Sequence, residues 1–155
     1  MRLSDHFTLA EFIRSDTAVR LKNNNMPTPA HQENLRRTAQ HMEQVRWVLG
    51  DNPITVTSAY RNPAVNRAVG GVSNSAHALG WAIDFVCPSF GDPLAICREI
   101  ERSSLNFDQL IHERKPNGSW WVHISFDPRM RRQCLTYNGT RYIPGIHPVN
   151  FGGRR

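Results

Sequence analysis

The sequence predicts one α+β domain, with N-terminal helices packed on a mainly antiparallel β-sheet. Helix-start signals come first along the chain, and runs of β-branched or aromatic residues come mostly later. Two Asn-Gly pairs, at residues 117–118 and 138–139, are typical of hairpin turns between such runs. With 155 residues, 39% of them hydrophobic, residues 1–155 are expected to form a single domain around one core.

Four helices are expected. Residues 7–12 combine a capping box between Thr8 and Glu11 with a Phe at both positions of a hydrophobic staple. The longest helix starts at residues 28–29, where Thr is the cap and Pro occupies the first turn, and Gly50 ends it. Two shorter helices follow Asn-Pro and Asp-Pro pairs, which are common helix starts: residues 62–69 and 92–102.

Six runs of β-branched and aromatic residues are expected to form strands. They cover residues 54–57, 81–86, 107–113, 120–126, 134–137 and 140–143. The small and polar residues 72–80, which lead into the second of these strands, are expected to form a loop.

The strand at 120–126 gives the sharpest local signal, because its side chains alternate between two faces. One face is wholly apolar and is expected to be core: Trp120, Val122, Ile124 and Phe126. His123 is therefore expected to point away from the core, with Trp121 beside it. In the strand at 81–86, Asp84 likewise lies opposite an apolar face, where a carboxylate is costly unless it is paired, hydrogen-bonded or metal-bound.

His77 precedes Asp84 by seven residues, and Gly80 between them allows a tight turn from loop to strand. Together with His123 they supply two imidazoles and one carboxylate. A three-ligand set with one open position is typical of catalytic rather than structural zinc, and water in that position has its pKa lowered to about 7. On spacing alone, a hydrogen-bonded structural His–Asp pair is the alternative.

Four segments around these residues resemble one family. Residues 75–84, S-A-H-A-L-G-W-A-I-D, resemble the S-x-H-x-x-G-x-A-x-D signature of the zinc D-Ala-D-Ala carboxypeptidase and endolysin family, peptidase M15. Residues 121–126 resemble its W-V-H-x-S-F strand, residues 58–62 its S-x-Y-R segment, and residues 7–12 the start of its domain. The resemblance covers most of residues 5–145. The three motifs at residues 58–62, 75–84 and 121–126, in the right order, are much more specific than any one of them.

The resemblance implies a zinc peptidase that cuts peptidoglycan stem peptides at bonds with D-residues, with D-Ala-D-Ala and L-Ala-D-Glu both open. It implies one zinc ion per chain, held by His77, Asp84 and His123. It also suggests that Arg61 meets a substrate carboxylate, which a planar guanidinium binds through two parallel hydrogen bonds; a structural salt bridge is the alternative. Further substrate-binding residues are expected at Ser58, Tyr60, Ser75 and Trp121, with ordinary packing as the alternative for the two aromatics.

The general base departs from the family pattern. Many relatives place an acid three residues before the last histidine ligand, where this sequence has Trp120. Amide hydrolysis needs a group that takes a proton from water and passes it to the leaving amine. Glu113, at the end of the partner strand, is the first choice, and His112 and Asp108 are its rivals. The alternative interpretation of Glu113 is a solvent-exposed hairpin carboxylate.

Charge is unevenly distributed along the chain, whose formal net charge is +6. Residues 1–126 carry 13 Lys and Arg against 12 Asp and Glu, whereas residues 127–155 carry six Arg against one Asp. This basic segment suits a polyanion such as an anionic envelope polymer, with a solvated tail as the alternative. The arginines of this segment are Arg129, Arg131, Arg132, Arg141, Arg154 and Arg155. They do not alternate with aromatic residues as in proteins that bind single-stranded nucleic acid, which argues against nucleic acid as the partner.

The first residues lack the basic and then apolar pattern of a signal peptide, and no stretch approaches the roughly 20 apolar residues of a membrane helix. The expectation is a monomer that is made in the cytoplasm and acts on the cell wall, in the periplasm, after holin-type release, as phage endolysins do. Two other function classes remain: a non-catalytic zinc-containing domain that binds cell wall or protein, and a basic nucleic-acid binder. Three cysteines are expected to be small buried hydrophobes: Cys87, Cys97 and Cys134.

Overall fold

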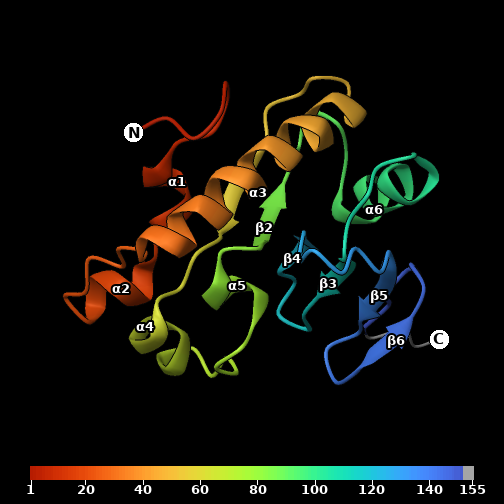
Figure 1. Ribbon diagram of the computed structural model, residues 1–155. Coiled ribbons are helices and arrows are strands. Elements are labelled where there is room, and N and C mark those ends of the chain that lie inside the picture. The colour runs from red at the N-terminus through yellow and green to blue at the C-terminus, as the bar shows by residue number, and fades with distance from the viewer. Residues whose placement is uncertain (152–155) are drawn as a thin grey trace.

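A six-stranded β-sheet forms the centre of the structure, with strand order β1-β2-β4-β3-β5-β6 (Figure 1). The computed structural model describes residues 1–151. The strands are β1 (Thr55–Ser58), β2 (Ala82–Val86), β3 (Gln109–Arg114), β4 (Trp120–Ser125), β5 (Gln133–Tyr137) and β6 (Tyr142–Pro144). Each strand starts and ends within two residues of the expected positions.

Neighbouring strands are antiparallel except for β3 and β5, which run parallel. β3 and β4 form a hairpin that is closed by a hydrogen bond from the Lys115 N–H to the Ser119 carbonyl, and Gly118 has a φ of 93° in this turn. After β4, residues 126–132 carry the chain past β3 to its far side. The prediction of a mainly antiparallel sheet is confirmed, and the one parallel pair arises because β3 lies between β4 and β5.

Helices precede or interrupt the strands along residues 1–151: α1 (Leu9–Ile13), α2 (Asp16–Arg20), α3 (Pro29–Val48), α4 (Pro63–Ala68), α5 (Ala76–Leu79) and α6 (Pro93–Arg102). α1, α3, α4 and α6 begin at the predicted caps, whose side chains each accept a hydrogen bond from the N–H three residues later: Thr8, Thr28, Asn62 and Asp92. The predicted capping box of α1 also forms. These four helices therefore start where local side-chain chemistry places them.

Two short helices differ from the sequence prediction, which has no helix at α2 and a loop over residues 72–80, where α5 lies. Ser15 caps α2 and Ser75 caps α5, each by accepting a hydrogen bond from the N–H three residues later. Segments this short show no apolar periodicity, and tertiary packing stabilises them. Gly80 ends α5 with a φ of 87°, and a side chain there would lie 2.9 Å from the His31 carbonyl oxygen. The tight turn expected at Gly80 is therefore present.

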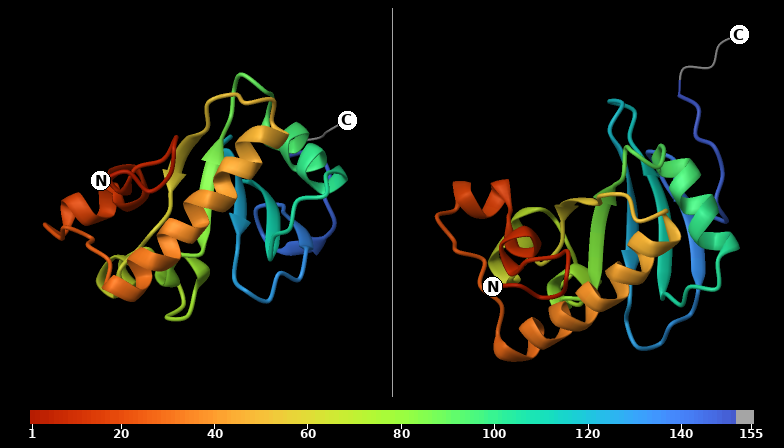
Figure 2. Two further views of the ribbon diagram at one scale, coloured as in Figure 1. Left: turned by 45° about the horizontal axis from the view of Figure 1, so that its top comes forward. Right: turned by 90° about the horizontal axis from the view of Figure 1, so that it is seen from above.

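α3 and α6 cover one face of the sheet, where the core lies (Figure 2). The apolar residues of α3 recur at helical spacing and are fully buried: Leu35, Ala39, Met42 and Val45. With α6 they pack against one face of the strands: Ile83, Phe85, Leu110, Val122 and Ile124. Because successive residues of a strand point to opposite faces, the polar residues between them are directed away from the core.

The cysteines are all free thiols. Cys87 and Cys97 are buried as expected, and burial raises the pKa of the Cys97 thiol, whereas Cys134 is half-buried. Across residues 1–151, no helix combines the length and the apolar character needed to cross a bilayer.

Candidate metal centre and cleft

An Asp–His pair lies on the face of the sheet opposite the core. Asp84 on β2 pairs in register with His123 on β4. The Asp84 Oδ1 atom lies 2.9 Å from the His123 Nδ1 atom. The alternation that buries Ile83 and Ile124 in the core directs both polar side chains to this second face.

His77 reaches the same carboxylate from α5. Its Nε2 atom lies 3.3 Å from the Asp84 Oδ1 atom. Its Nδ1 atom lies 2.6 Å from the carbonyl oxygen of Ala59, which can only accept a hydrogen bond, so Nδ1 carries the proton. This hydrogen bond fixes the ring orientation and leaves the Nε2 lone pair facing Asp84, as is usual for metal-binding histidines.

These three residues fit a divalent metal ion. One ligand atom from each lies within 4.8 Å of the other two. Burial raises the pKa of Asp84, but His77 and His123 outweigh it and hold this pKa below its ordinary value, so the carboxylate is ionised at neutral pH. Two imidazoles and one carboxylate are a donor set that zinc accepts in three-ligand sites.

The cluster opens into a cleft of about 680 Å³ that crosses the sheet. One side of the cleft is formed by α5 and the segment before it, and the other side extends over β3, β5 and β6. Its two acidic lining residues are Asp84 and Glu113, and its basic lining residues outside the cluster are Arg61 and Lys115. A substrate in this cleft would therefore meet the metal cluster beside one further carboxylate and two cations.

Glu113 lies on β3, next to β4, on the same face as His123. Burial raises the pKa of Glu113 to about 7, more than the nearby His123 lowers it. A carboxylate with a pKa near neutrality can accept and return a proton at pH 7. Trp120, which stands where the family pattern has an acid, instead packs against Arg114, whose guanidinium carbon lies 4.2 Å from the indole ring centre.

The two rivals for the base do not line the cleft. The Asp108 carboxylate accepts hydrogen bonds of 2.8 and 2.9 Å from the Arg131 guanidinium, and these bonds lower its pKa. His112 is fully buried on the core side of β3, and its Nδ1 atom lies 2.9 Å from the His147 carbonyl oxygen. Both side chains are therefore occupied by contacts that hold the fold.

Arg61 lies at the α4–α5 side of the cleft. Its backbone N–H donates to the His77 carbonyl, and its Nε donates to the Asn66 Oδ1 atom at 3.3 Å. Within the described residues the Arg61 guanidinium makes no ion pair, so the structural salt bridge kept as an alternative does not form there. Burial lowers the pKa of Arg61, and the attraction of Asp84 and Glu113 opposes this.

Comparison with known proteins decides the family. A model of the family described as Peptidase M15 matches residues 5–125. The chain belongs to the peptidase M15 family. It is also 41% identical over 54 residues to the zinc D-Ala-D-Ala carboxypeptidase of Streptomyces albus G, a segment that covers 35% of this chain and 21% of that protein. The match thus spans about a fifth of the relative's length.

The remaining predicted site residues of this member of the family divide into two groups. Ser75 and Trp121 line the cleft. Tyr60 is buried, with its hydroxyl 3.0 Å from the His31 Nδ1 atom, and Ser58 lies on β1; neither residue lines the cleft. The first group can touch a substrate directly, whereas the second does not reach the cleft surface.

Several residues in the cleft or next to it were not predicted from the sequence. Asn66 lies behind the lining residues Arg61 and Ser75: it is almost fully buried and accepts hydrogen bonds from both, and a side chain at Gly71 would collide with it. Leu135, Tyr137 and Tyr142 come from the β5–β6 hairpin, outside the family match, and Lys115 from the β3–β4 turn. For Leu135 and Tyr137 the sequence did offer a signal, because the alternation of side chains in residues 133–137 puts both on one face of the strand.

The arginines of the basic segment make local contacts. Arg129 binds Asp127, Arg131 binds Asp108, and Arg132 donates to the carbonyls of Ser103 and Leu105. These contacts anchor the loop between β4 and β5 to the rest of the domain. Two other arginines of the predicted patch, Arg154 and Arg155, lie outside the described residues.

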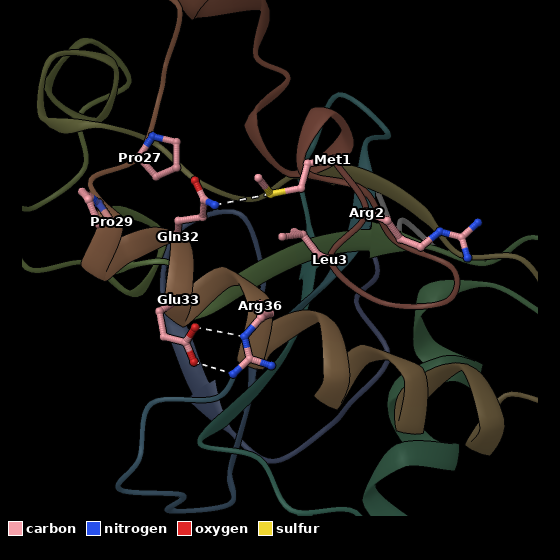
Figure 3. Close-up of a pocket in the computed structure, with 8 residues that line it drawn as sticks. All are labelled: Met1, Arg2, Leu3, Pro27, Pro29, Gln32, Glu33 and Arg36. Carbon is pink, nitrogen blue, oxygen red and sulfur yellow. Dashed lines mark hydrogen bonds and ion pairs between the residues drawn. The ribbon is translucent and has the colours of Figure 1, made fainter.

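A smaller pocket of about 340 Å³ lies between the N-terminus and the start of α3 (Figure 3). Met1 and Gln32 meet across it, and the Glu33–Arg36 ion pair lies at its rim. It shares no residue with the large cleft. Within residues 1–151 the candidate metal cluster is His77, Asp84 and His123, so the larger cleft contains the candidate metal site.

Proposed function

We propose that the protein is a zinc peptidase that hydrolyses amide bonds in the stem peptides of peptidoglycan. The observation that carries this proposal is the convergence of His77, Asp84 and His123 at the floor of an open cleft. Membership of the peptidase M15 family supports hydrolysis of a peptide. The similarity to a zinc D-Ala-D-Ala carboxypeptidase supports zinc and D-amino-acid peptides.

In this proposal His77, Asp84 and His123 hold the ion, and the Ala59 carbonyl keeps the His77 ring in place. A bound zinc ion polarises a carbonyl group and lowers the pKa of water. Glu113 takes one proton from the attacking water as the new C–O bond forms, and gives it to the leaving nitrogen as the C–N bond breaks. In the metal-free cleft, burial raises its pKa to about 7, so the cleft wall itself favours a carboxyl group that can hold a proton between the two transfers.

Arg61 orients the substrate in the same proposal. It is half-buried, and no ion pair within the described residues neutralises its charge. A guanidinium in this state can bind a carboxylate of the stem peptide through two parallel hydrogen bonds. Asn66, held in turn by Ser75, fixes the position of the Arg61 side chain.

The test is a digest of purified peptidoglycan by the zinc-loaded protein, analysed by mass spectrometry. New stem-peptide fragments are expected from the wild type, and at least about 100-fold fewer from Glu113→Gln. Chelation should abolish the activity, and added zinc should restore it. A wild type that binds zinc but releases no fragment would favour the second candidate, a non-catalytic zinc-containing binding domain, which the Trp120 substitution at the usual acid position supports.

The endolysin role is part of the proposal and has a separate test. Expression of the protein alone in the cytoplasm should leave bacteria intact, and co-expression with a holin should lyse them. Lysis that does not depend on the holin, or no lysis with it, would contradict this role without affecting the peptidase chemistry.

A further inference from the structure

The cleft extends well beyond the metal cluster in one direction. Register across the sheet places His123, Ile111 and Leu135 in one row on β4, β3 and β5. The next row runs from Trp121 and Glu113 to the two tyrosines of the hairpin. Both rows line the cleft, which therefore continues from the metal cluster to the edge strand β6, at the far end of the sheet from β1 (Figure 1).

The length of this extension corresponds to several residues of substrate. Neighbouring strands are about 4.8 Å apart, so the three steps from β4 to β6 span about 14 Å. An extended peptide rises about 3.3 Å per residue, so about four residues fit along this distance. The opposite side of the cleft, toward Arg61, is lined instead by α5 and the segment between α4 and α5.

Apolar and aromatic side chains form most of the extension toward β6, beside Glu113 and Lys115, which also line the cleft. Ile111 and Leu135 form its floor, and the rings of Tyr137 and Tyr142 lie with their centres 4.7 Å apart. The Tyr137 hydroxyl donates to the Gly139 carbonyl at 3.1 Å, which holds the hairpin turn. Tyr142 keeps 53% of its surface exposed, an amount that leaves its ring available to a ligand.

The hairpin also lies outside the segment that the family match covers. The family match ends at residue 125, before β5 begins, so Leu135, Tyr137 and Tyr142 all come from outside it. Residues that line a cleft away from the reacting atoms are suited to set substrate preference rather than the chemical step.

We infer that the hairpin wall formed by Leu135, Tyr137 and Tyr142 is a substrate subsite. It binds an extended peptide segment on the side of the scissile amide away from the carboxylate that Arg61 holds. The enzyme is then selective for chains that continue for about three or four residues beyond the bond it cuts. This inference rests on the proposed function, because it assumes that a peptide is hydrolysed at the metal cluster.

The test uses two synthetic substrates that share the bond identified by the peptidoglycan digest. The long substrate keeps four residues on the hairpin side, and the short one keeps a single residue with a neutral cap. With the wild type, kcat/KM should be about tenfold higher for the long substrate, mostly through KM. Tyr142→Ala should lower kcat/KM about three- to tenfold on the long substrate and less than about twofold on the short one.

Two further variants distinguish the subsite from a general effect. Tyr142→Phe keeps the ring and should retain most of the preference for length. Trp47→Ala removes an aromatic side chain of α3 that is 79% exposed and lies outside the cleft lining. This variant should leave kcat/KM unchanged on both substrates. Circular dichroism and thermal unfolding of Tyr142→Ala should match the wild type, because Tyr142 is largely exposed.

Each outcome bears on one claim. If the wild type cleaves neither substrate, the proposed function fails. If it cleaves both equally well, or if Tyr142→Ala lowers both equally, the subsite inference is overturned while the proposed function stands. A rise in kcat/KM that requires a muramyl sugar rather than added residues would also overturn the inference, because the hairpin wall would then bind the glycan and not the peptide.

Discussion

The two faces of the sheet differ sharply, although the same strands build both. On β4, Val122 and Ile124 are fully buried against the helices, and His123 between them belongs to the metal cluster. On β3, Leu110 lies in the core, whereas Glu113 lines the cleft. One face is apolar and closed, and the other carries ligands, charges and an open cleft.

The comparison shows how each face depends on the other. Burial of charged groups is unfavourable, and this cost raises the pKa of Glu113. The apolar face supplies the stability that offsets this cost, at about 25 cal/mol for each Å² of apolar surface removed from water. Because neighbouring residues alternate between faces, tight packing of Val122 and Ile124 also holds the His123 side chain in position.

The largest effect is expected from His123→Ala on the cleft face. Removing one of three ligands should weaken zinc binding by more than about 100-fold, beyond the loss typical of an outer-shell partner. Isothermal titration of the metal-free protein with zinc measures this. His6→Ala, which changes an exposed histidine far from the cleft lining, should bind zinc as the wild type does. Tight one-to-one binding by His123→Ala would rule out the assigned ligand set.

Substitution of the neighbouring residue on the core face should lower folding stability rather than act on zinc binding directly. Ile124→Ala leaves a cavity among fully buried side chains and should lower the free energy of unfolding by about 2–5 kcal/mol. Urea unfolding of the metal-free protein measures it, with metal-free His123→Ala as the comparison. An equal loss of unfolding free energy in the two variants would show that the two faces do not have separate roles in stability and metal binding.

The pH dependence of stability sharpens the comparison for Glu113. Its folded pKa of about 7 exceeds the ordinary 4.5, so between these values the unfolded chain has lost a proton that the folded protein keeps. Stability therefore falls by up to about 3 kcal/mol as the pH rises through this window. Asp84 does not add to this, because its lowered pKa leaves it ionised throughout the window.

The variant Glu113→Gln removes this titration. Urea unfolding of the metal-free proteins at pH 5 and pH 8 should show a smaller loss of stability for the variant than for the wild type. The same loss in both proteins would mean that Glu113 is not buried in the cleft wall as the structure describes.

The smallest effect is expected from Arg61→Lys, which keeps the charge but loses the two parallel hydrogen bonds to a carboxylate. We expect kcat/KM on stem peptides to fall about tenfold, mainly through a higher KM. Steady-state kinetics measures the change. Arg67→Lys, an exposed arginine of α4, is the matched control and should leave kcat/KM unchanged. A fall in kcat alone would assign Arg61 to the chemical step instead of binding.

Local sequence signals predicted much of the fold and of the candidate site. Caps such as Thr8 and Asp92 act within a few residues, so they were readable without tertiary information. Alternation in 120–126 separated His123 from Ile124 for the same reason. The single turns α2 and α5 were missed, because one turn of helix is too short to show a periodic pattern.

Long-range contacts decided the rest. The parallel pairing of β5 with β3 depends on which sheet edge was free, and the support of Arg61 by Asn66 depends on how residues 66–75 fold back. Tyr142 joins the cleft only because the hairpin extends the sheet by two strands beyond β3. None of these contacts has a signature within the local pattern of residues.

By itself the sequence indicated the candidate metal ligands, the face of each strand on which they lie and the caps of four helices, because the period of a strand and the chemistry of a cap are local properties. The tertiary structure alone decided that His77, Asp84 and His123 meet, that Glu113 is buried enough to have a pKa near 7, and how far the cleft extends. Distances between residues remote in the chain, and the loss of water around a charge, depend on how the whole domain packs.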